Sequence, residues 1–239
     1  MIMEKSLHNS LNNSKIVTSN QTGVHDDLLL ILKRYSTQEY KRPIAEFSRT
    51  TFKELLLWIQ SFKNKSLVLD MGCGTGESSY QLARCYPDCL VIGIDKSISR
   101  IERNNEFKNS LPVNVKIVRG ELLDLWYLFY QASVKNEVTV HKQYILFPNP
   151  WPKKKLIKRR FHANPIFPFI LSLSSKIELR TNWKIYAQEF ASACEFFGLE
   201  NVICSDYIPD QAVSNFELKY LESNHDLYKV ETNELNDGR

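Results

Sequence analysis

The sequence predicts a doubly wound α/β fold, with a mostly parallel β-sheet of seven strands, an antiparallel closing strand and helices on both faces. Short aliphatic runs alternate with longer helix-like segments through most of the chain, which is the pattern of repeated strand–helix–strand units. Three glycines, Gly72, Gly74 and Gly76, directly follow one aliphatic run and precede a helix-like segment. Such a turn is typical of the first strand and helix in folds of this class.

Two helices are expected first, at 26–34 and 44–63, as an N-terminal helical extension. Asp26 and Asp27 suit the first turn of the earlier helix, because the helix dipole stabilises negative charge there. The aliphatic runs predict strands, in chain order, at 66–70, 90–94, 113–118, 144–147, 176–180, 201–206 and 226–230. The segments between them predict helices at 77–86, 97–108, 121–131, 164–172 and 183–197. Two stretches, 148–160 and the connection between the last two strands, are expected to be loops.

The length and composition suit one globular domain, which we expect to span residues 26–230. Residues 1–25 and 231–239 are rich in polar residues and lack periodic hydrophobicity, so both are predicted to be flexible. The longest aliphatic run, Leu28 to Leu32, is far shorter than the roughly 18 residues of a membrane span. The N-terminus carries no signal-peptide pattern. We therefore expect a cytoplasmic protein with no membrane partner. The sequence leaves the oligomeric state open, with a monomer slightly favoured.

The cysteines and histidines give no metal-binding pattern. The five cysteines are odd in number and contain no C-x-x-C pair, which argues against a disulfide framework and against a zinc site. His141 and His162 lack the spacing of metal ligands. We therefore expect no metal.

Positive charge is concentrated in one segment of the chain. No Asp or Glu occurs between Val138 and Ile177, whereas eight of the chain's 31 basic residues lie there. The other 23 are outnumbered by 27 acidic residues. A clustered surplus of this kind favours a polyanionic partner, because phosphate contacts release bound counterions.

The glycine turn predicts a cofactor site. Asp70 ends the preceding aliphatic run, and the spacing D-x-G-x-G-x-G through Gly72, Gly74 and Gly76 resembles the first motif of S-adenosylmethionine-dependent methyltransferases. A dinucleotide fingerprint would need glycine at Glu77, and a glutamate there would repel a pyrophosphate at the helix N-terminus. We expect Asp70 to hold the amino acid part of the cofactor, directly or through water.

Two further acids follow the next two strands. Asp95 ends its strand 23 residues after Gly72, which is the usual distance for an acid that accepts hydrogen bonds from ribose hydroxyls. Glu121 comes just after the third strand and is placed to contact adenine. S-adenosylmethionine is therefore the expected cofactor.

The basic segment contains the sequence F-P-N-P-W-P-K-K-K from Phe147 onward, at the carboxyl end of the fourth strand, where open α/β sheets bind substrates. Its prolines stiffen the backbone and Trp151 offers a stacking surface. The cations expected to grip the phosphates of an RNA substrate are Lys153, Lys154, Arg159 and Arg160.

Over about residues 40–230 the chain resembles the bacterial tRNA (guanine-N7)-methyltransferases. The resemblance rests on the glycine turn and on F-P-N-P-W-P-K-K-K-x-x-K-R-R, R-T-N-W-x-x-Y and S-x-F-E-x-K, the latter two starting at Arg180 and Ser214. It implies a Rossmann-like methyltransferase fold and methyl transfer to N7 of a guanine in tRNA, in the variable loop. The implied cofactor contacts are Asp70, Asp95, Glu121 and Asn149. The implied substrate contacts are Lys153, Asn182 and the segment from Ser214 to Glu217.

The chain departs from that family's pattern at the reacting centre. The family usually has aspartate at Asn149 and at Asn182, and threonine at Ser214. Guanine N7 has a lone pair and no proton, so its attack on the methyl group needs no general base. It needs the guanine to be held in the correct position. Methylation leaves a cationic guanine, which a carboxylate stabilises better than an amide does. The candidate catalytic residues are thus Asn149 and Asn182, with Glu217 as the remaining acid.

Two alternatives stay open. Asn149-Pro150-Trp151-Pro152 is an imperfect match to the tetrapeptide of amine methyltransferases, which act on exocyclic groups such as adenine N6. Loss of the two carboxylates also suits an inactive homologue that binds cofactor and RNA. Trp183 and Tyr186, three residues apart on a predicted helix, are expected to be core residues.

Overall fold

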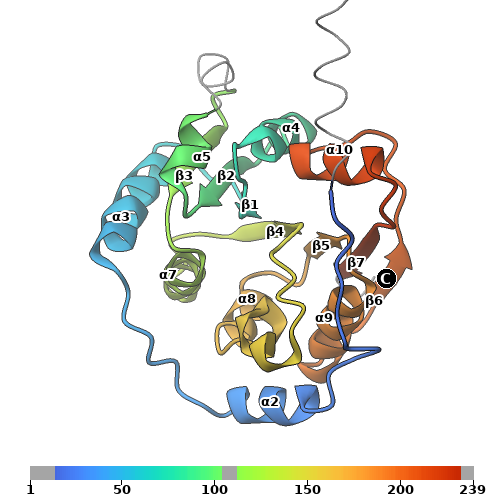
Figure 1. Cartoon of the computed structure of the whole chain (residues 1–239). Helices are drawn as coiled ribbons and strands as arrows, with labels where there is room; N and C mark the ends of the chain where they lie inside the picture. The colour runs from blue at the N-terminus through green and yellow to red at the C-terminus, as the bar shows by residue number, and fades with distance from the viewer. Residues whose placement is uncertain (1–13, 104–111, 233–239) are drawn as a thin grey trace, which may run out of the picture.

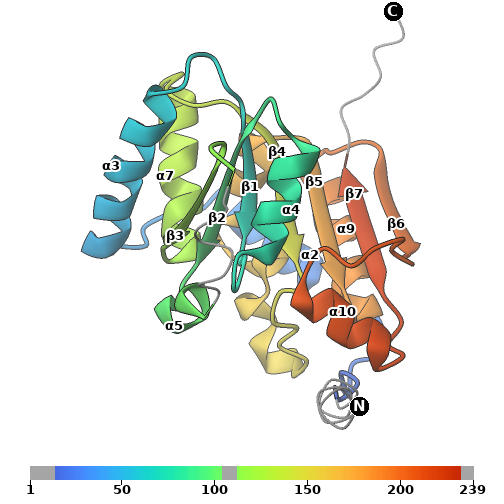
Figure 2. The same ribbon diagram turned by 90° about the horizontal axis from the view of Figure 1, so that it is seen from above.

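The computed structural model describes residues 14–103 and 112–232. Within these ranges the chain forms one sheet with the strand order β3-β2-β1-β4-β5-β7-β6, which Figure 2 shows side by side. The strands are β1 (Leu67–Met71), β2 (Leu90–Asp95), β3 (Val115–Arg119), β4 (Val140–Leu146), β5 (Ile177–Thr181), β6 (Val202–Asp206) and β7 (Tyr228–Thr232). β1 to β5 pair in parallel, whereas β7 is antiparallel to β5 and β6. The predicted sheet is confirmed.

Helices cover both faces of the sheet, as Figure 1 shows. They are α2 (Leu28–Tyr35), α3 (Glu46–Gln60), α4 (Glu77–Cys85), α5 (Ile98–Glu102), α7 (Leu122–Val134), α8 (Phe167–Leu173), α9 (Lys184–Phe196) and α10 (Asn215–Glu222). α4, α5 and α10 lie on one face, α3, α7, α8 and α9 lie on the other, and α2 packs outside α9. In the described part of the chain, no helix has the length and apolar character required to cross a membrane.

The core divides into two clusters because neighbouring side chains of a strand point to opposite faces. Leu67 and Leu69 of β1 pack in the large cluster, with the α7 and α9 side chains. Val68 packs in the small cluster, with Leu82 of α4. Every residue of β1 and β2 is buried, as expected for parallel strands covered on both faces.

Several boundaries differ from the sequence prediction. β4 begins at Val140, earlier than the predicted 144, and β7 continues through Thr232, whose partner in the sheet is Ile177. The predicted loop 148–160 contains the short 3₁₀ helix η1 (Lys154–Arg159), which η2 (Phe161–Ala163) follows. The connection between β6 and β7 contains α10. Of the predicted helix 97–108, residues 104–108 lie outside the described part.

Residues 14–25 run in extended form beside α10 and α9 to the start of α2 (Figure 1). Ser14 N–H donates to Ser223 Oγ at 3.3 Å, and Ser19 Oγ donates to the Pro152 carbonyl at 2.6 Å. Gln21 is buried against Glu189 of α9. This part of the predicted flexible arm is therefore tied to the domain by tertiary hydrogen bonds. Residues 1–13 lie outside the described part.

Candidate active site

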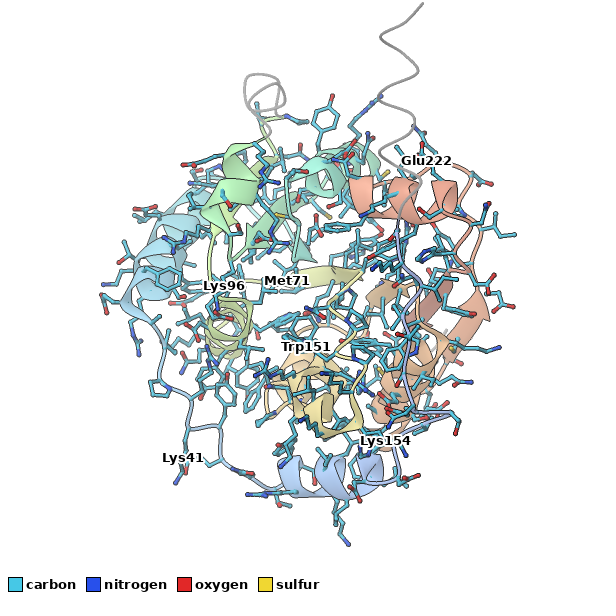
Figure 3. The ribbon with its side chains drawn as sticks, viewed as in Figure 1. Lys41, Met71, Lys96, Trp151, Lys154 and Glu222 are labelled. Carbon is cyan, nitrogen blue, oxygen red and sulfur yellow. The ribbon has the colours of Figure 1, made fainter. Side chains whose placement is uncertain are left out.

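A cavity of about 940 Å³ opens at the carboxyl ends of β1, β2 and β4. This is where the strand order reverses between β1 and β4, the position at which doubly wound sheets bind ligands. Figure 3 shows Met71, Lys96 and Trp151 of its lining near the centre of the view. Of the predicted site residues, the cavity lining includes Gly72, Asp95, Glu121, Asn149 and Arg159.

The glycine turn joins β1 to α4 through three left-handed residues. Gly72, Gly74 and Gly76 have φ values of +98°, +61° and +88°, which side-chain-bearing residues rarely adopt. The Gly72 and Cys73 N–H groups both donate to the Ile94 carbonyl, at 2.8 and 3.0 Å. A Cβ on Gly76 would also lie 2.2 Å from the Ile117 side chain. The turn is thus fixed against the end of β2, with Gly72 at the cavity wall.

Asp95 connects the end of β2 to the glycine turn. Its Oδ2 accepts from the Gly74 N–H at 3.0 Å, and its Oδ1 accepts from the Ser97 N–H at 2.7 Å. Arg100 pairs with the same Oδ1 at 3.0 Å. An ionised carboxylate has about four acceptor positions, and three of them are used here. Asp95 can therefore hold the turn and still accept a hydrogen bond from a ligand in the cavity.

Glu121 lies at the N-cap of α7 with 18% of its side chain exposed. Its Oε2 pairs with Lys96 Nζ at 2.7 Å, and both residues line the cavity. Each of the two carboxylates in the lining therefore has a basic neighbour from the segment after β2. The positions of Asp95 and Glu121 agree with the strand ends predicted for them.

Asp70 lies behind the glycine turn, outside the cavity lining. Its Oδ2 accepts from the hydroxyls of Ser78 and Ser79, at 2.6 and 2.7 Å, in the first turn of α4. Burial raises the pKa of Asp70 to about 6, although both hydroxyls favour the charged form. In this arrangement Asp70 fastens α4 to β1. The pair Ser78-Ser79 is the sequence signal for that contact.

Replacing Asp70 with asparagine should remove a pH-dependent part of the stability. Because the folded-state pKa of about 6 lies above the ordinary value of 3.8, the folded chain binds a proton between pH 6 and 4 that the unfolded chain does not. This carboxyl therefore makes the wild type more stable as the pH falls, by up to roughly 3 kcal/mol relative to Asp70→Asn. Urea denaturation of both proteins at pH 4 and pH 7 measures the difference. If the wild type and the variant differed in free energy of unfolding by the same amount at pH 4 and at pH 7, the raised pKa of Asp70 would be contradicted.

The segment Phe147 to Trp151 crosses the cavity in a strained conformation. Phe147 and Trp151 have positive φ values of +50° and +45°, which are outliers for bulky side chains and occur mainly at functional sites. Pro148 and Pro150 fix φ between them. The Asn149 Oδ1 accepts from the Trp151 N–H at 3.3 Å. The loop therefore presents Asn149 and the Trp151 ring to the cavity in one fixed arrangement.

Arg159 and Arg160 are neighbours in sequence with opposite environments. Arg159 is exposed, lines the cavity and lies 4.6 Å from the centre of the Trp151 ring. Arg160 is fully buried, where it pairs with Glu189 and donates to the Trp151 carbonyl at 3.1 Å and to Gln21 Oε1 at 3.0 Å. Arg160, predicted as a substrate contact, holds the backbone of the loop in this structure.

Glu189 is the centre of this buried cluster, and no sequence pattern identified it. Its carboxylate also accepts from the His25 N–H at 3.0 Å and lies 2.9 Å from His162 Nε2. Burial opposes the charged form, but the hydrogen bonds from His162 and Arg160 and the positive charge of Arg160 lower the pKa of Glu189. Burial lowers the pKa of His162, so that ring is neutral at pH 7. One carboxylate thus joins α9, the basic segment and the N-terminal strap, residues 14–25.

The other predicted substrate contacts lie outside the cavity lining. Asn182 Nδ2 donates to His225 Nδ1 at 3.0 Å, which leaves His225 Nε2–H to donate to the Ser14 carbonyl at 3.0 Å. Lys153 is exposed at the N-cap of η1, and Lys154 pairs with Asp26 at 3.4 Å. Asn182 therefore helps to hold the strap.

Ser214 and Glu217 fix α10 over the glycine turn. Ser214 Oγ caps the helix by accepting from the Glu217 N–H at 3.2 Å. The buried Glu217 carboxylate accepts from Arg180 at 3.0 and 3.2 Å and from the Val213 N–H at 2.7 Å. The same helix brings Phe216 and Tyr220 to the cavity. The S-x-x-E spacing of a helix N-terminus is the sequence signal that could have identified α10.

Trp183 and Tyr186 are buried in the core, as the sequence predicted. Among the residues that the structure describes, no group of three or more His, Cys, Asp or Glu side chains could hold a metal ion.

Comparison with known proteins finds relatives over this same region. A family model described as "Putative methyltransferase" matches residues 64–230. A tRNA (guanine-N(7)-)-methyltransferase of Thermotoga maritima is 31% identical over 144 residues, which cover 58% of this chain and 44% of that protein. A protein of the same name from Bacillus cytotoxicus is 26% identical over 185 residues, which cover 73% of this chain and 82% of that protein. The chain thus aligns with less than half of the Thermotoga protein's length.

A solved structure supports the fold. The structure of the 16S rRNA methyltransferase KamB matches with a TM-score of 0.51 at 16% identity, over 81% of this chain and 95% of that one. The protein therefore has the Rossmann-like methyltransferase fold. The family match implies S-adenosylmethionine as its methyl donor. The family model covers β1 to β6, the start of β7, the glycine turn and all of the cavity lining except Arg42. The chain belongs to the methyltransferase family that this model describes.

Proposed function

We propose that this methyltransferase acts on N7 of a guanine in tRNA. One observation carries the proposal: two features line the same cavity. The first is the glycine turn with the acids Asp95 and Glu121, and the second is the strained loop with Asn149 and Trp151. The names of the two relatives support the same substrate. The concentration of basic residues around η1 agrees with a polyanionic partner.

The residues around the glycine turn fit S-adenosylmethionine. The cavity has the volume of a cofactor site, Gly72 offers backbone without a side chain, and the Asp95 carboxylate has an acceptor position to spare. We assign ribose binding to Asp95 and adenine binding to Glu121. When bound, the cofactor supplies an electrophilic methyl carbon attached to a sulfonium sulfur.

The residues after β4 would place the guanine. The Arg159 guanidinium lies over the Trp151 ring, and the two planar groups together offer a stacking surface with a positive charge for a base and its phosphate. Guanine N7 carries a lone pair and no proton, so no residue of this chain would have to remove a proton from it. The chain's main task is therefore to hold N7 in line with that carbon, within about 3–3.5 Å. The hydrogen bond from Arg160 to the Trp151 carbonyl holds the loop in its conformation with a positive φ at Trp151, so the loop needs no rearrangement to place the base.

Asn149→Asp should raise the rate of methyl transfer to tRNA, by about tenfold. A carboxylate can accept from the Trp151 N–H as the amide does, and it also stabilises the positive charge that develops on guanine. Single-turnover kinetics with saturating tRNA measure the rate. Asn164→Asp is the matched control, because Asn164 lines the same cavity outside the Phe147–Trp151 loop. A lower rate in Asn149→Asp would indicate that the amide is adapted to a different acceptor atom.

The proposal is tested by incubating the protein with methyl-labelled cofactor and an unmodified tRNA transcript, followed by mass spectrometry of the nucleosides. The expected product is 7-methylguanosine. N6-methyladenosine would establish the amine methyltransferase alternative. Calorimetric binding of both ligands without any methylated nucleoside would identify an inactive homologue.

A further inference from the structure

A second hollow, of about 560 Å³, lies between α2 and η1 and is called here the α2–η1 groove. It is lined from α2 and the residues before it by His25, Asp27, Leu30, Ile31, Arg34 and Tyr35, and from η1 by Lys154, Lys155, Ile157 and Lys158. Lys158 also lines the central cavity, so the two hollows meet at η1. In Figure 3, Trp151 lies between Met71 of the central cavity and Lys154 of the groove.

The groove is strongly basic. Four of its lining residues, Arg34, Lys154, Lys155 and Lys158, are cationic, whereas Asp27 is the one carboxylate among them. All four cations are exposed, and the Lys154 contact with Asp26 is a solvated pair at 3.4 Å, of a kind that contributes little. A ligand with several negative charges would therefore gain from every cation in the groove without breaking a buried ion pair.

The groove is also apolar between its cations. Leu30 is 70% exposed, and Ile31, Ile157 and Tyr35 supply the rest of a nonpolar floor. A face of solvated lysines alone would have no such floor. A strand of RNA alternates charged phosphates with less polar sugars and bases. Its phosphates would contact the cations of the groove, and its sugars or bases would lie over the nonpolar floor. Grooves that bind single-stranded nucleic acids combine the same two features.

Both walls of the groove are fixed by the buried cluster around Glu189. The His25 N–H, just before α2, donates to this carboxylate at 3.0 Å, and Arg160, which directly follows η1, pairs with it. Leu28 and Leu32 bury the inner side of α2 in the core. The groove is thus a preformed feature held in register with the Trp151 loop.

We propose that the α2–η1 groove binds the sugar–phosphate backbone of the RNA next to the nucleotide that enters the central cavity. The inference rests on the proposed function for the identity of the RNA. The shared residue Lys158 allows one strand to occupy both hollows, with its target base at Trp151 and the adjoining backbone between α2 and η1.

The test compares the double variant Arg34→Ala/Lys155→Ala with the matched control Lys33→Ala/Lys63→Ala. The control removes two exposed cations, one of them on α2, that do not line the groove. Binding of unmodified tRNA is measured over a range of salt concentrations. The groove variant should bind tRNA about tenfold more weakly. The slope of log K plotted against log salt concentration should be shallower by about 1.4–1.8, because two phosphate contacts are lost. The control should match the wild type in both.

Wild-type affinity and slope in the groove variant would overturn the proposal. So would a groove variant that binds tRNA normally but changes oligomeric state in size-exclusion chromatography, since a second copy of the chain would then be the occupant. RNA binding is measured here without turnover. Failure of the wild type to form 7-methylguanosine would therefore count against the proposed function and leave this test of the groove intact.

Discussion

Arg160→Ala is expected to lower the free energy of unfolding by about 3–5 kcal/mol, whereas Arg159→Ala should lower it by less than about 1 kcal/mol. Removing the buried guanidinium leaves Glu189 charged and without its main partner, and frees the Trp151 carbonyl. Removing the exposed guanidinium beside it breaks only the contact with the Trp151 ring. Urea denaturation followed by fluorescence measures both values.

The same two variants should separate stability from substrate binding. Arg159→Ala should fold normally, bind the cofactor as the wild type does and lose affinity for tRNA, because its side chain lines the cavity. Should Arg160→Ala fail to fold, Arg160→Lys serves instead, because it keeps the charge and loses the planar group that bonds several partners at once. Similar stability losses at both positions would contradict the division of roles.

Asp95→Asn is expected to weaken binding of S-adenosylmethionine by about 100-fold. Hydrogen bonds to a charged group contribute roughly 1.5–3 kcal/mol each, and this carboxylate is also the acceptor that fixes the Gly74 N–H in the glycine turn. The amide has one oxygen in place of two and cannot replace all of these contacts. Isothermal titration calorimetry with the cofactor alone measures the loss.

Asp88→Asn is the matched control for this loss, because the Asp88 side chain is 98% exposed. It should bind the cofactor like the wild type. Thermal unfolding of Asp95→Asn establishes that the variant is folded under the conditions of the titration. A folded Asp95→Asn protein that keeps its affinity within threefold of the wild type would refute the assignment of Asp95.

The features that the sequence predicted correctly are local ones. The sequence predicted that Gly72 and Asp95 lie together at the strand ends, where both line the cavity, because a buried strand, a glycine turn and an acid at the next strand end recur at fixed spacing. The sheet followed from the alternation of aliphatic runs with helical segments, and the antiparallel closing strand was also correct. Each of these depends on residues that are close together in the chain.

The features that the sequence did not predict depend on distant contacts. Nothing in K-R-R distinguishes the exposed Arg159 from the buried Arg160, because the difference comes from Glu189 on α9 and from Gln21. The N-terminal strap is polar and reads as a flexible segment, yet its hydrogen bonds to Pro152 and Glu189 hold it in place. Charge patterning identifies a basic surface, but it cannot assign each cation to a ligand or to the core.

Methyl transfer to a tRNA transcript in which every guanine is replaced by 7-deazaguanine tests the central claim most directly. The replacement puts a C–H where N7 was and so removes the lone pair that the account makes the nucleophile, while the phosphates of the transcript are unchanged. The account predicts rapid transfer to the ordinary transcript and none above background to the 7-deaza transcript, with equal binding of both. Undiminished transfer to the 7-deaza transcript would contradict it.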